Sequence, residues 1–330
     1  MSSSTAITCV SPRIPLARMR SIYRLEEVSR RLEKLPPKEH ESLRATYERM
    51  LEKGEQRFQV KPSGLPAMEA LYDELPNFHE VLDDVRRQIA LCNDSSDALE
   101  ITPLLLLGPP GVGKTHFARQ LAELLGTGMG FVSMSSLTAG WVLSGASSQW
   151  KGARAGKVFE ALVEGEYANP VMVVDEIDKA GGEAAYDPLG SLYSLLEHDT
   201  ASAFIDEFAE VAVDASQVIW VATANDARSI PDPILNRVNV FEVQAPDFAA
   251  AKAIALRLYQ KLRGSHDWGR RFDDQPSDAV LDRMAELAPR EMRRAWMTGF
   301  GNARLAQRGT VLCEDLPAAS QKKGRIGFMQ

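Results

Sequence analysis

The sequence has few cysteines and no long hydrophobic run. Only 3 of its 330 residues are cysteine, and Cys9, Cys92 and Cys313 lie far apart without the spacing of a metal site. This usage excludes a disulfide-stapled scaffold and a structural zinc site, and it fits a reducing compartment. The longest aliphatic run, residues 104–107, is far shorter than the roughly 20 residues that span a bilayer. We therefore expect a cytoplasmic protein with no membrane partner.

Basic residues are fewer than acidic ones. The 38 Lys and Arg residues face 45 Asp and Glu residues, which gives a net charge of −7. This balance disfavours a protein whose whole surface binds nucleic acid, although it leaves room for a local basic groove. The first 20 residues are an exception, because they carry Arg13, Arg18 and Arg20 and no acidic residue. Such a segment is typical of a transit peptide or a flexible basic arm, and we favour the arm.

Hydrophobic periodicity divides the rest of the chain. Apolar residues at helical spacing predict one helix before Pro36 and a second over residues 38–54, followed by a linker at 61–66. Aliphatic runs then predict buried parallel strands, and amphipathic helices replace them after residue 247. The strands are expected at residues 104–107, 131–134, 171–174, 218–222 and 238–243.

This pattern predicts an α/β fold in which a doubly wound parallel sheet is followed by a small helical domain. We expect a flexible arm at residues 1–20, a helical N-terminal region with its linker at 21–97, an α/β domain at 98–245, a helical lid at 246–316 and a tail at 317–330.

The segment GPPGVGKT at residues 108–115 has the spacing of a P-loop, and it lies between an aliphatic strand and a helix as a P-loop must. Backbone N–H groups of such a loop surround phosphate oxygens, and the helix N-terminus adds partial positive charge. We expect Lys114 to reach the β- and γ-phosphates of ATP, and Thr115 to ligate Mg²⁺. The nucleotide-binding residues expected here are Gly108, Pro109, Pro110, Gly111, Val112, Gly113, Lys114, Thr115 and His116.

Two later strands end in polar side chains. Residues 171–174 are followed by Asp175 and Glu176, and residues 218–224 are followed by Asn225. Ligands of open α/β sheets bind at this edge. We expect Asp175 to bind Mg²⁺ at the nucleotide, Glu176 to polarise the attacking water, and Asn225 to hold that water from the γ-phosphate side.

These motifs resemble the AAA+ ATPases and, within them, the ATPase module of Lon proteases. GPPGVGKT, VVDEIDKA, DPLGSLYSLLEHD and VATANDARSIPDPILNRVNVFEV are each similar to a Lon stretch, in the same order, over about residues 98–316. The resemblance implies a Mg²⁺-dependent ATPase with Asn225 as sensor 1 and Arg237 as the arginine finger that enters the neighbouring subunit's site. Lon usually has an acidic residue before that arginine, where this chain has Asn236.

The resemblance extends to the lid and to substrate-facing loops. APREMRR is similar to the sensor 2 stretch, which implies that Arg290 touches the nucleotide phosphates, with Arg293 as the alternative one turn on. Residues 145–158 align without gaps on Lon's first pore loop and place Trp150 and Lys151 at its aromatic–aliphatic pair. No periodic apolar face surrounds Trp150, which favours the pore loop over packing under a loop. Residues 204–205 are candidates for a second pore loop.

Three functions are compatible with these features. The first is a homo-oligomeric ring, expected to be a hexamer, that uses ATP to unfold or remodel an unidentified protein client. The chain ends soon after its lid, so we expect a stand-alone ATPase without Lon's protease domain. The second is a nucleotide-switched assembly factor that binds a partner through its N-terminal helices. The third is a nucleic-acid motor similar to RuvB, which the acidic charge and the lack of a basic winged-helix segment disfavour.

Overall fold

The computed structural model describes residues 16–36, 40–66, 68–136, 141–150, 152–180 and 189–317. The chain forms two compact units. Of the described residues, the sheet unit holds those up to 66, those within 80–107 and those within 118–241, and the lid unit holds residues 68–79, 108–117 and 242–317. The lid unit thus includes two segments that the expected division at residue 246 assigned elsewhere.

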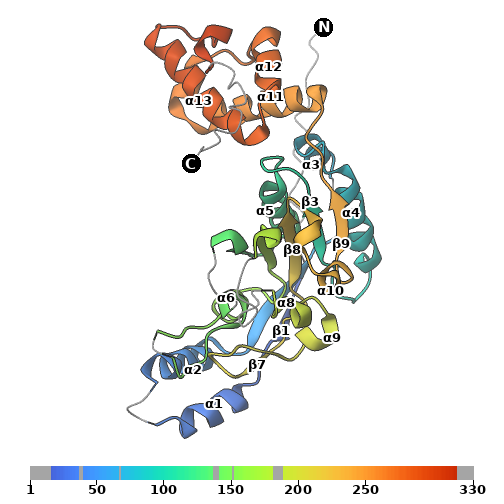
Figure 1. Ribbon diagram of the computed structural model, residues 1–330, viewed down its shortest axis with the longest axis vertical. Helices are drawn as coiled ribbons and strands as arrows, with labels where there is room; N and C mark the ends of the chain where they lie inside the picture. The colour runs from blue at the N-terminus through green and yellow to red at the C-terminus, as the bar shows by residue number, and fades with distance from the viewer. Residues whose placement is uncertain are drawn as a thin grey trace, which may run out of the picture. The chain divides into compact units, whose positions relative to one another are not determined.

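A five-stranded sheet is the centre of the sheet unit, with the strand order β4-β5-β8-β3-β9 (Figure 1). Adjacent strands β4 and β5, β5 and β8, and β8 and β3 are parallel. The strands are β3 (Leu104–Leu107), β4 (Met129–Ser133), β5 (Val171–Asp175), β8 (Ile219–Ala224) and β9 (Asn239–Glu242). All five confirm the strands expected from the aliphatic runs. The runs of β3, β5 and β8 are continuous because these central parallel strands are buried on both faces.

Short elements fill the connections of the sheet. The helices that precede and follow its strands are α4 (His79–Cys92), α5 (Lys114–Leu125), α6 (Trp141–Ser144), α7 (Lys157–Phe159, continued by a π-helical turn), α8 (Leu192–Leu195), α9 (His198–Ala201) and α10 (Asp232–Leu235). A small hairpin pairs β6 (Phe204–Ile205) with β7 (Ala212–Val213). Among the described residues no helix is both long and apolar enough to span a membrane.

The N-terminal region corrects one expectation. Residues 16–20, assigned to the flexible arm, belong to strand β1 (Leu16–Ser21), which pairs in antiparallel register with β2 (Gln56–Lys61). Arg20 is held by Asp214 at 2.7 Å, so a basic residue of the supposed arm is fixed to the folded unit. Composition alone missed this strand because its partner lies about forty residues away in the sequence. Residues 1–15 lie outside the described part of the chain.

Two helices, α1 (Leu25–Lys34) and α2 (Glu41–Lys53), confirm the helical pair expected between these strands. They do not form a separate domain. The Tyr47 hydroxyl of α2 donates to the backbone oxygen of Ala209 at 2.8 Å, and the buried Arg57 guanidinium of β2 donates to backbone oxygens at Leu162 and Val163. Residues 16–61 therefore share the core of the sheet unit.

The lid unit contains α3 (Glu69–Glu74) and the bundle α11 (Phe248–Ser265), α12 (Asp278–Ala285) and α13 (Pro289–Leu305) (Figure 1). In its core the Tyr259 ring stacks on Phe300 and meets Trp296 edge to face, and the indole N–H of Trp296 donates to the backbone oxygen of Ala255 at 3.0 Å. Pro289 at the first position of α13 sets the start of that helix, because its fixed φ suits the first turn.

Candidate nucleotide site and the hollow beside Trp150

The predicted P-loop lies in the lid unit and leads into helix α5. Gly111 and Gly113 adopt φ of +86° and +108°, a region that favours glycine. A Cβ atom on Gly108 would stand 2.1 Å from the backbone oxygen of Val243, so no side chain fits there. Each of the three glycines in the motif therefore has a backbone or steric reason to be glycine.

Lys114 is directed back onto this loop. Its ammonium group donates to the backbone oxygens of Gly108 at 2.6 Å and Pro109 at 3.1 Å, and the side chain is largely buried. Thr115 follows it in the first turn of α5, where the helix dipole is positive. His116 is exposed, and its Nε2 atom lies 2.9 Å from the Glu74 carboxylate of α3.

Arg290 lies directly against the P-loop. Its Cδ and Nε atoms are 2.7 and 3.1 Å from the position that a Cβ on Gly111 would take. The structure thus brings the predicted sensor 2 residue and the predicted phosphate loop together within one unit. Arg293, the alternative, is exposed one turn further along α13.

Two P-loop neighbours were missed from the sequence. The Asn77 amide donates to the backbone oxygens of Val112 at 3.2 Å and Gln244 at 3.0 Å. The Phe78 ring lies 3.6 Å from the Cβ position of Gly113 and stacks on Phe117, with centroids 5.1 Å apart. These residues follow the linker, where nothing in the local pattern separates a loop-supporting side chain from an ordinary turn residue.

The predicted acidic pair lies at the carboxyl end of β5 in the sheet unit. The buried Thr223 hydroxyl of β8 donates to Asp175 Oδ1 at 2.7 Å and accepts from the backbone N–H of Glu176 at 3.0 Å. Glu176 adopts a left-handed backbone with φ of +56°, which turns the chain out of the strand. Thr223, which the sequence did not single out, thus joins both acidic residues to the neighbouring strand.

Asn225 follows β8 directly, at the same edge of the sheet as Asp175 because β5 and β8 are adjacent and parallel. The next residue, Asp226, closes a tight turn by accepting hydrogen bonds from Arg228. These bonds lower the pKa of the Asp226 carboxyl to about 2.

Arg237, the predicted arginine finger, follows helix α10 in the sheet unit. Its guanidinium forms an ion pair with Glu197 at 2.7 Å and donates to the backbone oxygen of Pro233 at 2.6 Å. The sequence did not point to Glu197 as its partner, because the two residues are forty positions apart.

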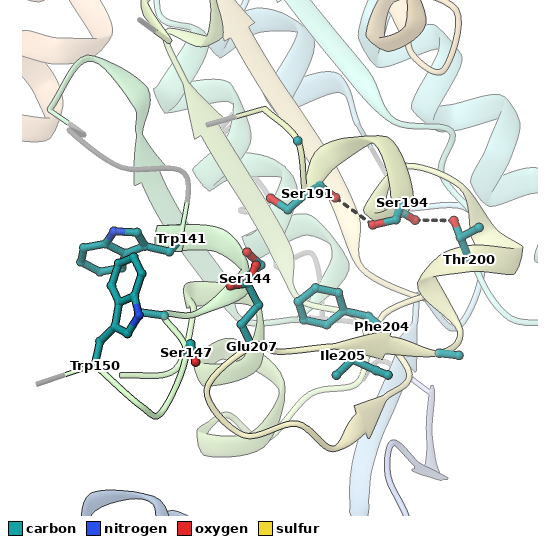
Figure 2. A pocket seen from close by; sticks show the side chains of 13 residues that line it. Trp141, Ser144, Ser147, Trp150, Ser191, Ser194, Thr200, Phe204, Ile205 and Glu207 are labelled. Atoms are coloured by element: carbon teal, nitrogen blue, oxygen red, sulfur yellow. Dashed lines mark hydrogen bonds between the residues drawn. The ribbon is translucent and has the colours of Figure 1, made fainter. Parts of the chain in front are cut away.

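Trp150 borders an open hollow of about 700 Å³ in the sheet unit. Trp150 and Ile205 are 57% and 56% exposed, so neither is packed under a loop. Figure 2 shows Trp141 and Trp150 on one side of the hollow, and Phe204 and Ile205 on the other, with Glu207 between them. The structure therefore places the first and second candidate pore-loop segments at one hollow. Lys151 lies outside the described residues.

Residues 104–245 match the family model described as "ATPase family associated with various cellular activities (AAA)". The chain is 36% identical over 172 residues to Lon protease 2 of Hydrogenovibrio crunogenus, a match that covers 50% of this chain and 19% of that protein. It is 37% identical over 140 residues to the mitochondrial Lon protease homolog of Schizosaccharomyces pombe, covering 42% and 13%. The chain thus spans about a fifth or less of these curated relatives.

Among solved structures, the chain is similar to S. cerevisiae Hsp104 in its extended complex with casein. The TM-score is 0.58 at 15% sequence identity, and the match covers 85% of this chain and 51% of that one. At this identity the likeness concerns the fold alone.

Proposed function

Because residues 104–245 are an AAA ATPase domain similar to that of Lon proteases, we propose that the chain hydrolyses ATP to unfold or remodel protein clients. In this proposal it works as a homo-oligomeric ring, a hexamer, in the cytoplasm. The observation that carries the proposal is the exposed Trp150, which shares an open hollow with Ile205 in the sheet unit, the unit that also holds Asp175 and Glu176. ATP hydrolysis alone does not require large apolar side chains exposed at a hollow, whereas gripping a polypeptide does.

The P-loop and Arg290 bind the phosphates of ATP. When ATP binds, the Lys114 ammonium group exchanges the backbone oxygens of Gly108 and Pro109 for phosphate oxygens. The new hydrogen bonds are stronger because their acceptors are charged. The left-handed glycines let the backbone approach the phosphates closely, and α5 adds its dipole. Arg290 adds a second cation, and its packing against Gly111 supports this role.

Thr115 and Asp175 are the residues that would hold Mg²⁺. A hydroxyl and a carboxylate offer the hard oxygen atoms that this ion prefers, and Thr223 already orients the carboxylate. When bound, the ion neutralises charge on the transferring phosphoryl group.

Glu176 polarises the water that attacks the γ-phosphate, and Asn225 holds this water in line. The Thr223 hydroxyl fixes the backbone at Glu176 and so limits where its carboxylate can point. Arg237 of one subunit stabilises the developing charge in the site of the next, as arginine fingers do. To reach it, Arg237 leaves Glu197, which costs little because surface ion pairs are weak.

The client contacts the hollow through apolar side chains. Trp150 supplies a large rigid ring and Ile205 an aliphatic surface, and Lys151 belongs to the same loop. Glu207 is an acidic side chain at this surface, so a basic residue beside an apolar one in the client is accommodated.

Glu176→Gln tests the ATPase half of the proposal. The amide cannot accept a proton, so we expect turnover to fall about 100-fold or more, within the range of general base catalysis, while ATP still binds. Glu48→Gln, at an exposed carboxylate of α2 outside the motifs, is the matched control and should keep wild-type turnover. Unchanged turnover in Glu176→Gln would remove Glu176 as the group that activates water.

A further inference from the structure

A buried carboxylate lies between the Trp150 loop (residues 145–156) and the β6–β7 hairpin. Asp206 follows Ile205 and is fully buried. It accepts hydrogen bonds from three backbone N–H groups, those of Gly156 at 2.7 Å and of Phe208 and Ala209 at 3.0 Å. None of the ATP motifs includes this residue. Burying a carboxylate costs free energy unless its charge is compensated, and here three backbone N–H groups do so.

These bonds join two segments that are distant in sequence. Phe208 and Ala209 belong to the hairpin's own turn, whereas Gly156 ends the Trp150 loop, fifty residues earlier. A second bond runs from the backbone N–H of Glu207 to the backbone oxygen of Ser144, at 2.7 Å. The hairpin is therefore tied to the Trp150 loop at both of the loop's ends.

The two ends of the Trp150 loop, Gly145 and Gly156, pack closely around this carboxylate. Gly145 has φ of +84°, and a Cβ atom there would lie 2.6 Å from Asp206 Oδ1. A Cβ on Gly156 would lie 2.2 Å from the backbone oxygen of Leu143, so the two ends of the loop pack with no space between them. The backbone N–H of Ala146 donates to the backbone oxygen of Arg154 at 3.0 Å, which joins the two ends of the loop.

We propose that Asp206 is the positioning residue that makes the Trp150 loop and the β6–β7 hairpin one rigid client-gripping body. Charge-assisted bonds to backbone N–H groups are roughly twice as strong as neutral ones, so the carboxylate is the strongest tie between the two segments. A force applied to Trp150 by the motor then reaches Ile205 as well, and both residues pull together. The inference rests on the proposed function, since it explains how that function's two client-facing segments cooperate.

Asp206→Asn tests the tie while preserving side-chain shape. The amide loses the charge and turns an N–H₂ group toward at least one N–H donor, so a bond is lost. Amide hydrogen exchange should speed up at least tenfold in both residues 145–156 and residues 204–211, with β5 as an unaffected reference. Gly145→Ala, which crowds the carboxylate without changing its charge, should produce the same pattern, and it replaces Asp206→Asn if that variant does not fold.

The functional arm uses a fluorescent protein with an unstructured tail as client. We expect Asp206→Asn to unfold this client at least tenfold more slowly per ATP hydrolysed, while the control Glu48→Gln matches the wild type. Normal unfolding per ATP, or faster exchange in one segment only, would overturn the tie. A wild type that hydrolyses ATP but unfolds no client would instead contradict the proposed function, and the exchange experiment would still decide whether Asp206 joins the segments.

Discussion

Replacing Asp206 with Asn will change how the stability of the protein depends on pH. Burial raises the pKa of the Asp206 carboxyl from 3.8 to about 6, although the three backbone N–H donors oppose this rise and Glu207 adds to it. The folded protein therefore holds this proton more tightly than the unfolded chain does. The resulting contribution to stability is fully present below about pH 4 and is lost as the pH rises through about 6.

The size of the effect follows from the two pKa values. A rise from 3.8 to about 6 corresponds to about 3 kcal/mol, at about 1.36 kcal/mol per pKa unit. The free energy of unfolding of the wild type minus that of Asp206→Asn should therefore fall by most of this amount, about 2.5 kcal/mol, from about pH 4 to about pH 7. Urea titrations over this range measure both values, and groups that titrate in both proteins cancel in the difference.

Glu207→Gln is the matched control, because it removes the adjacent exposed carboxylate. The free energy of unfolding of the wild type minus that of Glu207→Gln should change by less than about 1 kcal/mol between about pH 4 and about pH 7, as expected for a surface charge. A difference that is flat with pH for Asp206→Asn, or one that rises, would refute the assignment of Asp206 as a buried carboxylate with a raised pKa.

Three further substitutions test the nucleotide site. Thr223→Val should lower the rate of ATP hydrolysis by about 10- to 100-fold without weakening ATP binding, because it removes a hydrogen bond to a charged group. Thr223→Ser should restore the rate, and an equal loss in both variants would contradict a role for the hydroxyl. Glu197→Gln should raise the ATP turnover of the assembled ring up to about fivefold, because it releases Arg237, and should lower the free energy of unfolding by less than about 1 kcal/mol. Lower turnover would mean that Glu197 holds Arg237 in its working position. Arg290→Ala should weaken ATP binding about tenfold or more in a fluorescent-nucleotide titration, and unchanged affinity would separate its contact with Gly111 from phosphate binding.

The sheet and the ATP motifs could be predicted because their signals are local. Each aliphatic strand and the polar residue at its end are contiguous in sequence, as in residues 171–175, and the P-loop glycines follow a fixed spacing. The exposure of Trp150 was also predictable, since its neighbours provide no apolar face. The roles assigned to these side chains in ATP hydrolysis and client binding remain predictions.

The supporting residues could not be predicted, because their roles depend on contacts between distant segments. Thr223 meets Asp175 across 48 positions, and Asp206 meets Gly156 across 50. Strand β1 was missed for the same reason: its pairing with β2 joins Leu16 to Lys61, and no short-range pattern distinguishes it from a basic arm.

The central claim is that ATP hydrolysis drives client unfolding through Trp150. The most direct measurement follows, in one reaction, ATP consumption and loss of fluorescence of the tailed fluorescent client, for the wild type and Trp150→Ala. We expect the wild type to unfold the client only with ATP, and the variant to hydrolyse ATP while unfolding at least tenfold less client per ATP. Equal unfolding per ATP in both proteins would contradict the account.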